Sequence, residues 1–247
     1  MRFHPVCTVA IVVLAASYAA FAQARRTAPI PKTRLRSTAP PPREAMKFSS
    51  PVFENRRLKV LRLELPAGGS TEVPGDIHDY VIVALDDASI NLNGGRSSFD
   101  LDLKNGEMNV IPGRWAHKIS NRGAAARLLL VEVTGEIDPN RARCGLAAEN
   151  CREVRFGRTA EGDYTQATLF DTNKVKMMRA ELGPSGVLRL HDDNASHLVV
   201  SLTPLRGSTE AQEVALNAGE VFWSDYGFQE LSNVGTETAK FLVMEVK

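Results

Sequence analysis

Four histidines are the residues of this chain best suited to chemistry. His78 and His117 lie in the first half of the sequence, and His191 and His197 lie in the second. In the second half, His191, Asp193 and His197 would share one face of a β-strand, because alternate strand residues point the same way. Imidazole and carboxylate groups arranged like this are ligands of divalent Fe, Mn, Ni or Zn.

In the first half, the segment from Gly106 to Asn121 reads G-E-M-N-V-I-P-G-R-W-A-H-K-I-S-N. Its spacing resembles the second signature motif of the cupin family, G-x5-P-x-G-x2-H-x3-N. Pro112, His117 and Asn121 hold their motif positions, and Arg114 stands where the family has Gly. The resemblance implies a small jelly-roll β-barrel that holds a metal or a small ligand inside.

The first cupin motif, G-x5-H-x-H-x3,4-E-x6-G, is less well kept in this half. Pro74, Asp76 and Tyr80 stand where the family has His, His and Glu. His78 lies two residues from Asp76 and two from Tyr80, so on a strand it would point inward with them. The resemblance therefore implies His78, His117 and Asp76 as metal donors of the first barrel. The other interpretation is a barrel mouth whose histidines bond to neighbours or to an organic ligand.

In the second half, the resemblance places His191, Asp193 and His197 at three of the four ligand positions. Counting back from Asn233 puts Gln229 at the position of the fourth, a histidine in the family. Gln is a poor ligand for a transition metal but a workable hydrogen-bonding group. A metal site and a polar pocket without metal both stay open for this barrel.

Further residues could contact a small-molecule ligand. Trp115 and Trp223 lie in the two second-motif segments, where they could line the barrel mouths and stack on a flat ligand. Packing is the more common role of such side chains. The ligand-binding candidates are Asp76, Tyr80, Trp115, Trp223 and Gln229.

The sequence that must form the supporting elements is repeated: its two halves follow the same pattern. Residues 55–65 align with residues 172–182 at a shift of 117, and residues 126–133 align with residues 239–246 at a shift of 113. A period this long indicates a duplicated domain. Each half consists of short runs rich in Val, Ile, Leu and Phe, separated by turn residues. We therefore expect an all-β chain with two tandem jelly-roll barrels.

The chain begins with a pattern typical of export. Arg2, an apolar run and small residues before position 24 form a signal-peptide pattern. An uncleaved membrane anchor is the alternative, although the apolar run is short for a bilayer span. We expect a periplasmic or secreted protein with no transmembrane domain after signal cleavage. The expected segments are a signal peptide at 1–24, a tether at 25–50, the first barrel at 52–136, a linker at 137–167 and the second barrel at 168–247.

The tether is rich in Pro and carries seven Lys or Arg residues against one Glu. This composition predicts a disordered, extended segment. It could touch anionic lipid or cell-wall polymer, and a solvated linker is the simpler interpretation. Nothing in the sequence indicates a nucleic-acid surface. The expected partner is a small molecule, and assembly into a homo-oligomer stays open.

Cys144 and Cys151 lie in the linker, seven positions apart. In an exported protein we expect them to form a structural disulfide. A metal-binding or redox pair is the other interpretation. It has less support, because no third soft ligand lies nearby and the spacing is not C-x-x-C.

Two functions of different kinds follow. One is a binding protein that holds a small molecule, with or without a divalent metal. The other is a metal-dependent oxygenase, isomerase or lyase that acts on a small periplasmic substrate. Neither half keeps all four family ligands, which favours the binding protein. The sequence has no G-x-S-x-G elbow, phosphate loop, dinucleotide fingerprint or H-E-x-x-H motif.

Overall fold

The computed structural model describes residues 46–247 except 76, 96, 114, 136, 138–153, 159–162, 191–194 and 226–229. The expected signal peptide, most of the tether and both linker cysteines lie outside the described residues. The described part contains strands β1 to β19 and no helix, so the all-β prediction is confirmed. Accordingly, no described helix is long and apolar enough to cross a membrane.

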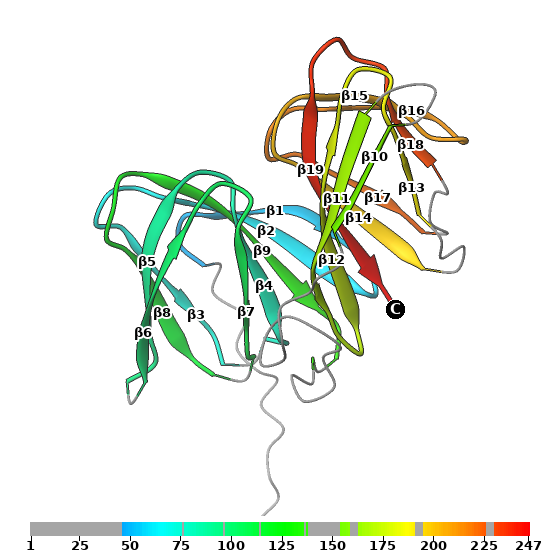
Figure 1. Cartoon of the computed structure of the whole chain (residues 1–247). Coiled ribbons are helices and arrows are strands. Elements are labelled where there is room, and N and C mark those ends of the chain that lie inside the picture. Colours follow the sequence, from blue (N-terminus) through cyan, green and yellow to red (C-terminus); the bar gives the residue numbers. More distant parts are fainter. Residues whose placement is uncertain are drawn as a thin grey trace, which may run out of the picture. The chain divides into compact units, whose positions relative to one another are not determined.

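Two sheets face each other in the first barrel, with the orders β1-β2-β9-β4-β7 and β3-β8-β5-β6 (Figure 1). Their inward side chains form one apolar cluster, which includes Leu63, Ile82 and Ile119. The strands are β1 (Ser49–Glu54), β2 (Leu58–Leu65), β3 (Ser70–Val73), β4 (Tyr80–Ala84), β5 (Ala88–Asn93), β6 (Ser98–Leu103), β7 (Met108–Ile111), β8 (His117–Asn121) and β9 (Ala126–Val133).

The second barrel repeats this plan, with the sheet orders β10-β11-β12-β19-β14-β17 and β13-β18-β15-β16. Its strands are β10 (Val154–Arg158), β11 (Asp163–Asp171), β12 (Val175–Leu182), β13 (Val187–Arg189), β14 (Ser196–Ser201), β15 (Leu205–Ser208), β16 (Glu213–Leu216), β17 (Val221–Ser224), β18 (Glu230–Asn233) and β19 (Ala239–Val246). Strand β10 and the first half of β11 fall in the segment expected to be a linker, and both pair into the larger sheet.

The duplication seen in the sequence extends to the strand register. In the first barrel, β2 pairs with β9 from Leu58 opposite Val133 to Leu65 opposite Ala126. In the second, β12 pairs with β19 from Val175 opposite Val246 to Leu182 opposite Ala239. The partners correspond at the same shifts of 117 and 113 that align the sequences. Residues of one barrel can therefore be compared with their equivalents in the other.

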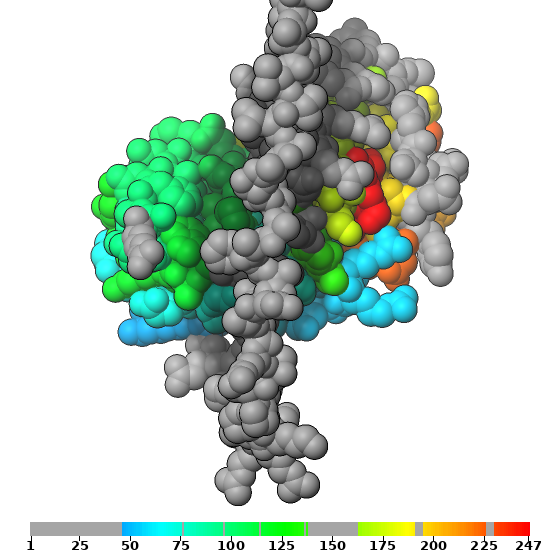
Figure 2. Space-filling model, turned by 90° about the horizontal axis from the view of Figure 1, so that it is seen from below, coloured from blue at the N-terminus to red at the C-terminus, as the bar shows by residue number. Residues whose placement is uncertain are grey.

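The outer faces of the two larger sheets share a second apolar cluster. Strands β2, β4 and β9 contribute to it from the first barrel, and β12, β14 and β19 contribute from the second. In Figure 2, the cyan segment of the first barrel borders orange and red segments of the second. Phe53 packs on Trp223 with ring centroids 5.6 Å apart, and Arg57 Nη1 donates to Ser196 Oγ at 2.8 Å.

Two equivalent arginines tie the barrels together reciprocally. Arg62 Nη2 donates to the Gly219 carbonyl at 2.8 Å, and Arg179 Nη2 donates to the Gly106 carbonyl at 2.7 Å. The arginines correspond at the shift of 117 and the glycines at 113. In a two-fold symmetric dimer, each subunit makes the same contact to the other. The two barrels of this chain contact each other in the same way. The glycine that opens the 106–121 motif thus serves the contact between barrels.

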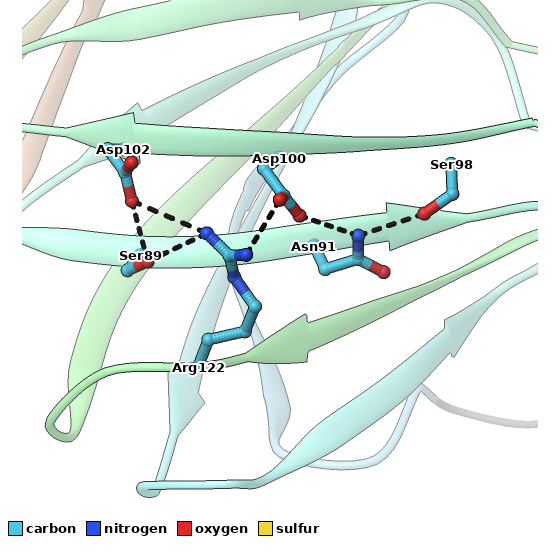
Figure 3. A network of polar contacts seen from close by, with 6 residues as sticks. All are labelled: Ser89, Asn91, Ser98, Asp100, Asp102 and Arg122. Carbon is cyan, nitrogen blue, oxygen red and sulfur yellow. Dashed lines mark hydrogen bonds and ion pairs between the residues drawn. The ribbon is translucent and has the colours of Figure 1, made fainter.

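A polar network covers the outer surface of the smaller sheet in the first barrel (Figure 3). The Arg122 guanidinium lies between two carboxylates, with Nη1 2.7 Å from Asp100 and Nη2 3.7 Å from Asp102. Ser89 Oγ donates to Asp102 at 2.6 Å, and Asn91 Nδ2 donates to Asp100 at 2.7 Å. The three ion-paired side chains are exposed, and exposed ion pairs contribute little to stability. The network links β5 and β6 to the end of β8 on the outside of the barrel.

Candidate functional site

The first barrel holds a tyrosine and a histidine from facing sheets at its centre. Tyr80 begins β4 and is 0% exposed, and His117 begins β8 and is 3% exposed. Tyr80 Oη lies 2.6 Å from His117 Nε2. The two rings are nearly parallel, with centroids 5.9 Å apart. The Tyr80 hydroxyl and one ring nitrogen of His117 are therefore hydrogen-bonded to each other inside the barrel.

The other ring nitrogen of His117 fixes the direction of this hydrogen bond. Nδ1 lies 2.6 Å from the carbonyl oxygen of Trp115. Because a carbonyl can only accept, Nδ1 carries the proton, and Nε2 of the neutral ring accepts from the Tyr80 hydroxyl. Burial lowers the pKa of His117 and raises the pKa of Tyr80 far above its ordinary value. Both groups are consequently neutral at physiological pH.

Trp115 extends the pair into a stack of rings. Its indole lies 4.3 Å from the His117 ring and 5.7 Å from the Phe99 ring, between centroids. Phe99 is 38% exposed, so the stack runs from the core to the surface. Gly94 makes room for the indole, because a Cβ there would lie 1.8 Å from Trp115 Nε1. Trp115 thus packs against the barrel core, the role that is usual for such residues.

The structure does not bring His78 to His117. The His78 side chain is exposed, and its backbone N–H donates to Glu132 Oε1 at 2.9 Å. Both nitrogens of His117 are occupied, which leaves no lone pair for a metal. The described donors of the first barrel therefore do not fit a metal ion. Asp76, the third expected donor, lies outside the described residues.

The asparagine that ends each second motif has a structural role. Asn121 Nδ2 donates to the carbonyls of Leu65, Pro66 and Ala124. Asn233 Nδ2 donates in the same way to the carbonyls of Leu182, Gly183 and Glu237. Each amide is itself buried and donates to three backbone carbonyls, which explains why both halves have Asn at this position.

In the second barrel, β14 places His197 at the position that Tyr80 holds in the first. The two residues correspond at the shift of 117, and His197 is 0% exposed. Val199, two residues further along β14, belongs to the inner core of this barrel. Since alternate residues share a face, His197 also faces the barrel interior. The sequence prediction for the orientation of His197 agrees with this arrangement.

The strands on both sides of His197 add two polar residues that the sequence analysis missed. In register with His197 lie Glu245 of β19 and Ser224 of β17. Glu245 is 8% exposed and lies on the same inner face as His197. The corresponding residues beside Tyr80 are Glu132 and Ile111. The aligned ends of the two halves, which both contain this Glu, were the signal that could have identified Glu245.

Trp223, also predicted to contact a ligand in the second barrel, does not share the face of the sheet on which His197 lies. Trp223 pairs with Leu198, whose side chain belongs to the cluster between the barrels. Its indole packs on Phe53, and its Nε1 donates to Asp225 Oδ1 at 2.8 Å. Trp223 therefore faces the first barrel and points away from His197.

Three further predicted site residues of this barrel, His191, Asp193 and Gln229, lie outside the described residues, as do Cys144 and Cys151. Among the residues that the structure does describe, no three His, Cys, Asp or Glu side chains are grouped so that they could hold a metal. A metal site in the second barrel therefore stays a prediction.

No family model matches the sequence, and no curated protein matches it. Solved structures do match the fold. A putative glyoxylate-induced protein from Pseudomonas aeruginosa is 14% identical, with a TM-score of 0.58, over 82% of this chain and 84% of that one. A cupin 2 conserved barrel domain protein from Leptotrichia buccalis is 12% identical, with a TM-score of 0.52, over 81% and 88%.

A third similar structure is a mutant of oxalate decarboxylase from Bacillus subtilis. It is 14% identical, with a TM-score of 0.53, over 77% of this chain and 69% of that one. At such identities the likeness concerns the fold alone. Together with the paired sheets and the duplicated register, it shows that this chain has the cupin fold, built as two jelly-roll barrels in tandem.

Proposed function

We propose that this chain is an exported protein whose second barrel binds a small molecule together with a divalent transition metal, and whose first barrel is structural. The difference between two equivalent positions supports this most directly. Where the first barrel has Tyr80 and Ile111, the second has His197 and Ser224. The first barrel thus closes its interior with a tyrosine and an apolar side chain, whereas the second keeps an imidazole and a hydroxyl there.

The proposed metal ligands are His191, Asp193 and His197. The described member of this set fits the role, because the His197 imidazole lies inside the barrel beside a buried carboxylate. Two histidines and a carboxylate are a donor set that suits Fe(II), Mn(II), Ni(II) or Zn(II). A bound metal would supply Lewis acidity toward a carbonyl or water of the ligand.

A metal-dependent enzyme is the second candidate, and it would use the same residues. The observation in its favour is Glu245 beside His197, because an imidazole next to a carboxylate can also move protons. Oxalate decarboxylase, whose fold is similar, shows that a cupin fold can support catalysis. Turnover of a small substrate that is lost in His197→Ala would favour the enzyme over the binding protein.

Metal analysis tests the proposal. The full chain, purified without a histidine tag and loaded separately with Fe(II), Mn(II), Ni(II) and Zn(II), is expected to hold about one metal ion. His197→Ala, and His191→Ala combined with His197→Ala, are expected to lose it, because the imidazole ligands are removed.

His78→Ala is the matched control, since this histidine is exposed and lies in the first barrel. It is expected to retain the metal content of the wild type. A chain that takes up none of the four metals would contradict the metal site. Loss of metal from His117→Ala alone would assign the metal to the first barrel and overturn the proposal.

Export predicts the redox state of the linker cysteines. After removal of the signal peptide, which contains Cys7, the chain keeps Cys144 and Cys151. Thiol titration of the denatured protein, isolated from an oxidising compartment, is expected to find no free thiol. Two free thiols per chain in that material would show that the disulfide is absent.

A further inference from the structure

His197 and Glu245 form a cross-strand pair inside the second barrel. They lie directly opposite each other on β14 and β19. Both are buried, at 0% and 8% exposure. Phe241 and Val243 of β19 belong to the inner core, and alternation from Val243 puts Glu245 on that inner face. A buried carboxylate and a buried imidazole therefore share one face of one sheet.

This arrangement allows both side chains to reach a single ion. Directly opposite residues in an antiparallel pair have Cβ atoms about 4.5–5.5 Å apart. A divalent metal binds an imidazole nitrogen or a carboxylate oxygen at about 2.0–2.2 Å. The flexible Glu245 side chain can thus bring an oxygen next to the metal-facing nitrogen of His197. It does so from β19, the strand that pairs with the His197 strand β14.

The first barrel shows what the same carboxylate does without an imidazole beside it. Glu132 is the equivalent of Glu245, and its Oε1 accepts the His78 backbone N–H at 2.9 Å. Its cross-strand neighbour is Tyr80, whose hydroxyl donates to His117. Only the second barrel has a potential ligand directly opposite this carboxylate.

We propose that Glu245 completes the metal site of the second barrel as an additional carboxylate ligand, in compensation for the histidine that Gln229 replaces. The inference rests on the proposed function, since it assumes that His197 binds a metal. It adds a ligand that the cupin motifs do not include, because Glu245 lies on the last strand of the barrel. The donor set would then be two imidazoles and two carboxylates, which suits Mn(II) and Fe(II) particularly well.

Metal titration of the full chain tests the inference. Wild type, Glu245→Gln and Glu132→Gln are stripped with a chelator and titrated with Mn(II) and Zn(II) against a competing indicator. Glu245→Gln is expected to bind each metal at least about tenfold more weakly. Glu132→Gln, the same change at the equivalent position of the first barrel, is expected to bind like the wild type.

Substitution with Co(II) gives a readout of the ligands themselves. The visible absorption bands of the bound Co(II) are expected to change in Glu245→Gln and to stay unchanged in Glu132→Gln. Circular dichroism establishes that each variant is folded. Should Glu245→Gln fail to fold, Glu245→Asp, which keeps the charge but shortens the reach, is expected to show the same weakening and the same spectral change.

The outcomes separate this inference from the proposed function. Wild-type affinity and spectrum in Glu245→Gln, together with loss of metal in His197→Ala, would overturn the role of Glu245 and leave the metal site standing. Equal weakening in Glu245→Gln and Glu132→Gln would also overturn it, because the effect would not be specific to the second barrel. A wild-type chain that binds neither of these two metals, and takes up neither Fe(II) nor Ni(II) in the loading experiment, would overturn both.

Discussion

With His117 replaced by Ala, the free energy of unfolding is expected to fall by about 3–5 kcal/mol while metal uptake stays as in the wild type. The side chain is almost fully buried, so its removal leaves a cavity. It also leaves the buried Tyr80 hydroxyl and the Trp115 carbonyl without their partner. Urea denaturation followed by circular dichroism measures the loss, and metal analysis measures the uptake.

Two variants define the cause of this effect. Tyr80→Phe removes only the hydroxyl and is expected to cost about 1–3 kcal/mol, because Nε2 of His117 loses its donor. His78→Ala changes an exposed histidine of the same barrel and is expected to stay within about 0.5 kcal/mol of the wild type. A loss below about 1 kcal/mol in His117→Ala would show that the Tyr80–His117 pair does not hold the barrel together.

Replacement of Gly106 by Ala is expected to lower the free energy of unfolding by about 2–4 kcal/mol. Gly106 has a positive φ of 75°, which costs a residue such as Ala about 1–2 kcal/mol. An added Cβ would also lie 2.6 Å from Leu202 Cδ1 and 3.1 Å from Arg179 Nη2. The substitution thus disturbs the contact between the barrels, and urea denaturation measures its cost.

Gly95→Ala separates the two contributions. Gly95 has a similar φ of 79°, but an added Cβ would meet nothing within 4 Å. It is expected to show the backbone cost alone. Gly219→Ala, at the reciprocal position, should resemble Gly106→Ala, because its Cβ would lie 2.9 Å from Leu85 Cδ1. Equal costs for Gly95→Ala and Gly106→Ala would contradict a role for this turn in the interface.

The fold could be predicted from the sequence because its signals are local and repeated. Alternating apolar residues in strands such as Leu58–Leu65 determine which face is buried. The repeat at shifts of 117 and 113 indicates two barrels built on one plan, and in the structure the pairings β2–β9 and β12–β19 correspond at the same shifts. The start of the second barrel was harder to place, since β10 and the first half of β11 lie in residues 137–167, the segment expected to be a linker.

The site was predictable only in part, because the motif spacing positions residues but does not give their partners. It placed His117 inside the first barrel, where the structure has it. It could not show that the Trp115 carbonyl and the Tyr80 hydroxyl occupy both ring nitrogens, since those contacts depend on three-dimensional packing. The exposure of His78 could not be predicted for the same reason.

The contact between the two barrels gives other motif residues a structural role. Trp223 and Gly106 belong to motif segments that suggest a ligand site, yet both lie at the contact between barrels. Sequence spacing cannot distinguish a residue that faces a ligand from one that faces a second barrel. Glu245 could have been found, because its alignment with Glu132 was visible and only its position opposite His197 required the strand pairing.

The most direct test of the account is anomalous diffraction from crystals of the full chain loaded with Mn(II) or Zn(II), measured at the absorption edge of the metal. We expect one anomalous peak per chain, inside the second barrel and within bonding distance of His197, and none beside His117. A peak at His117, or the absence of any ordered peak near His197 in metal-loaded crystals, would contradict the division into a structural barrel and a binding barrel.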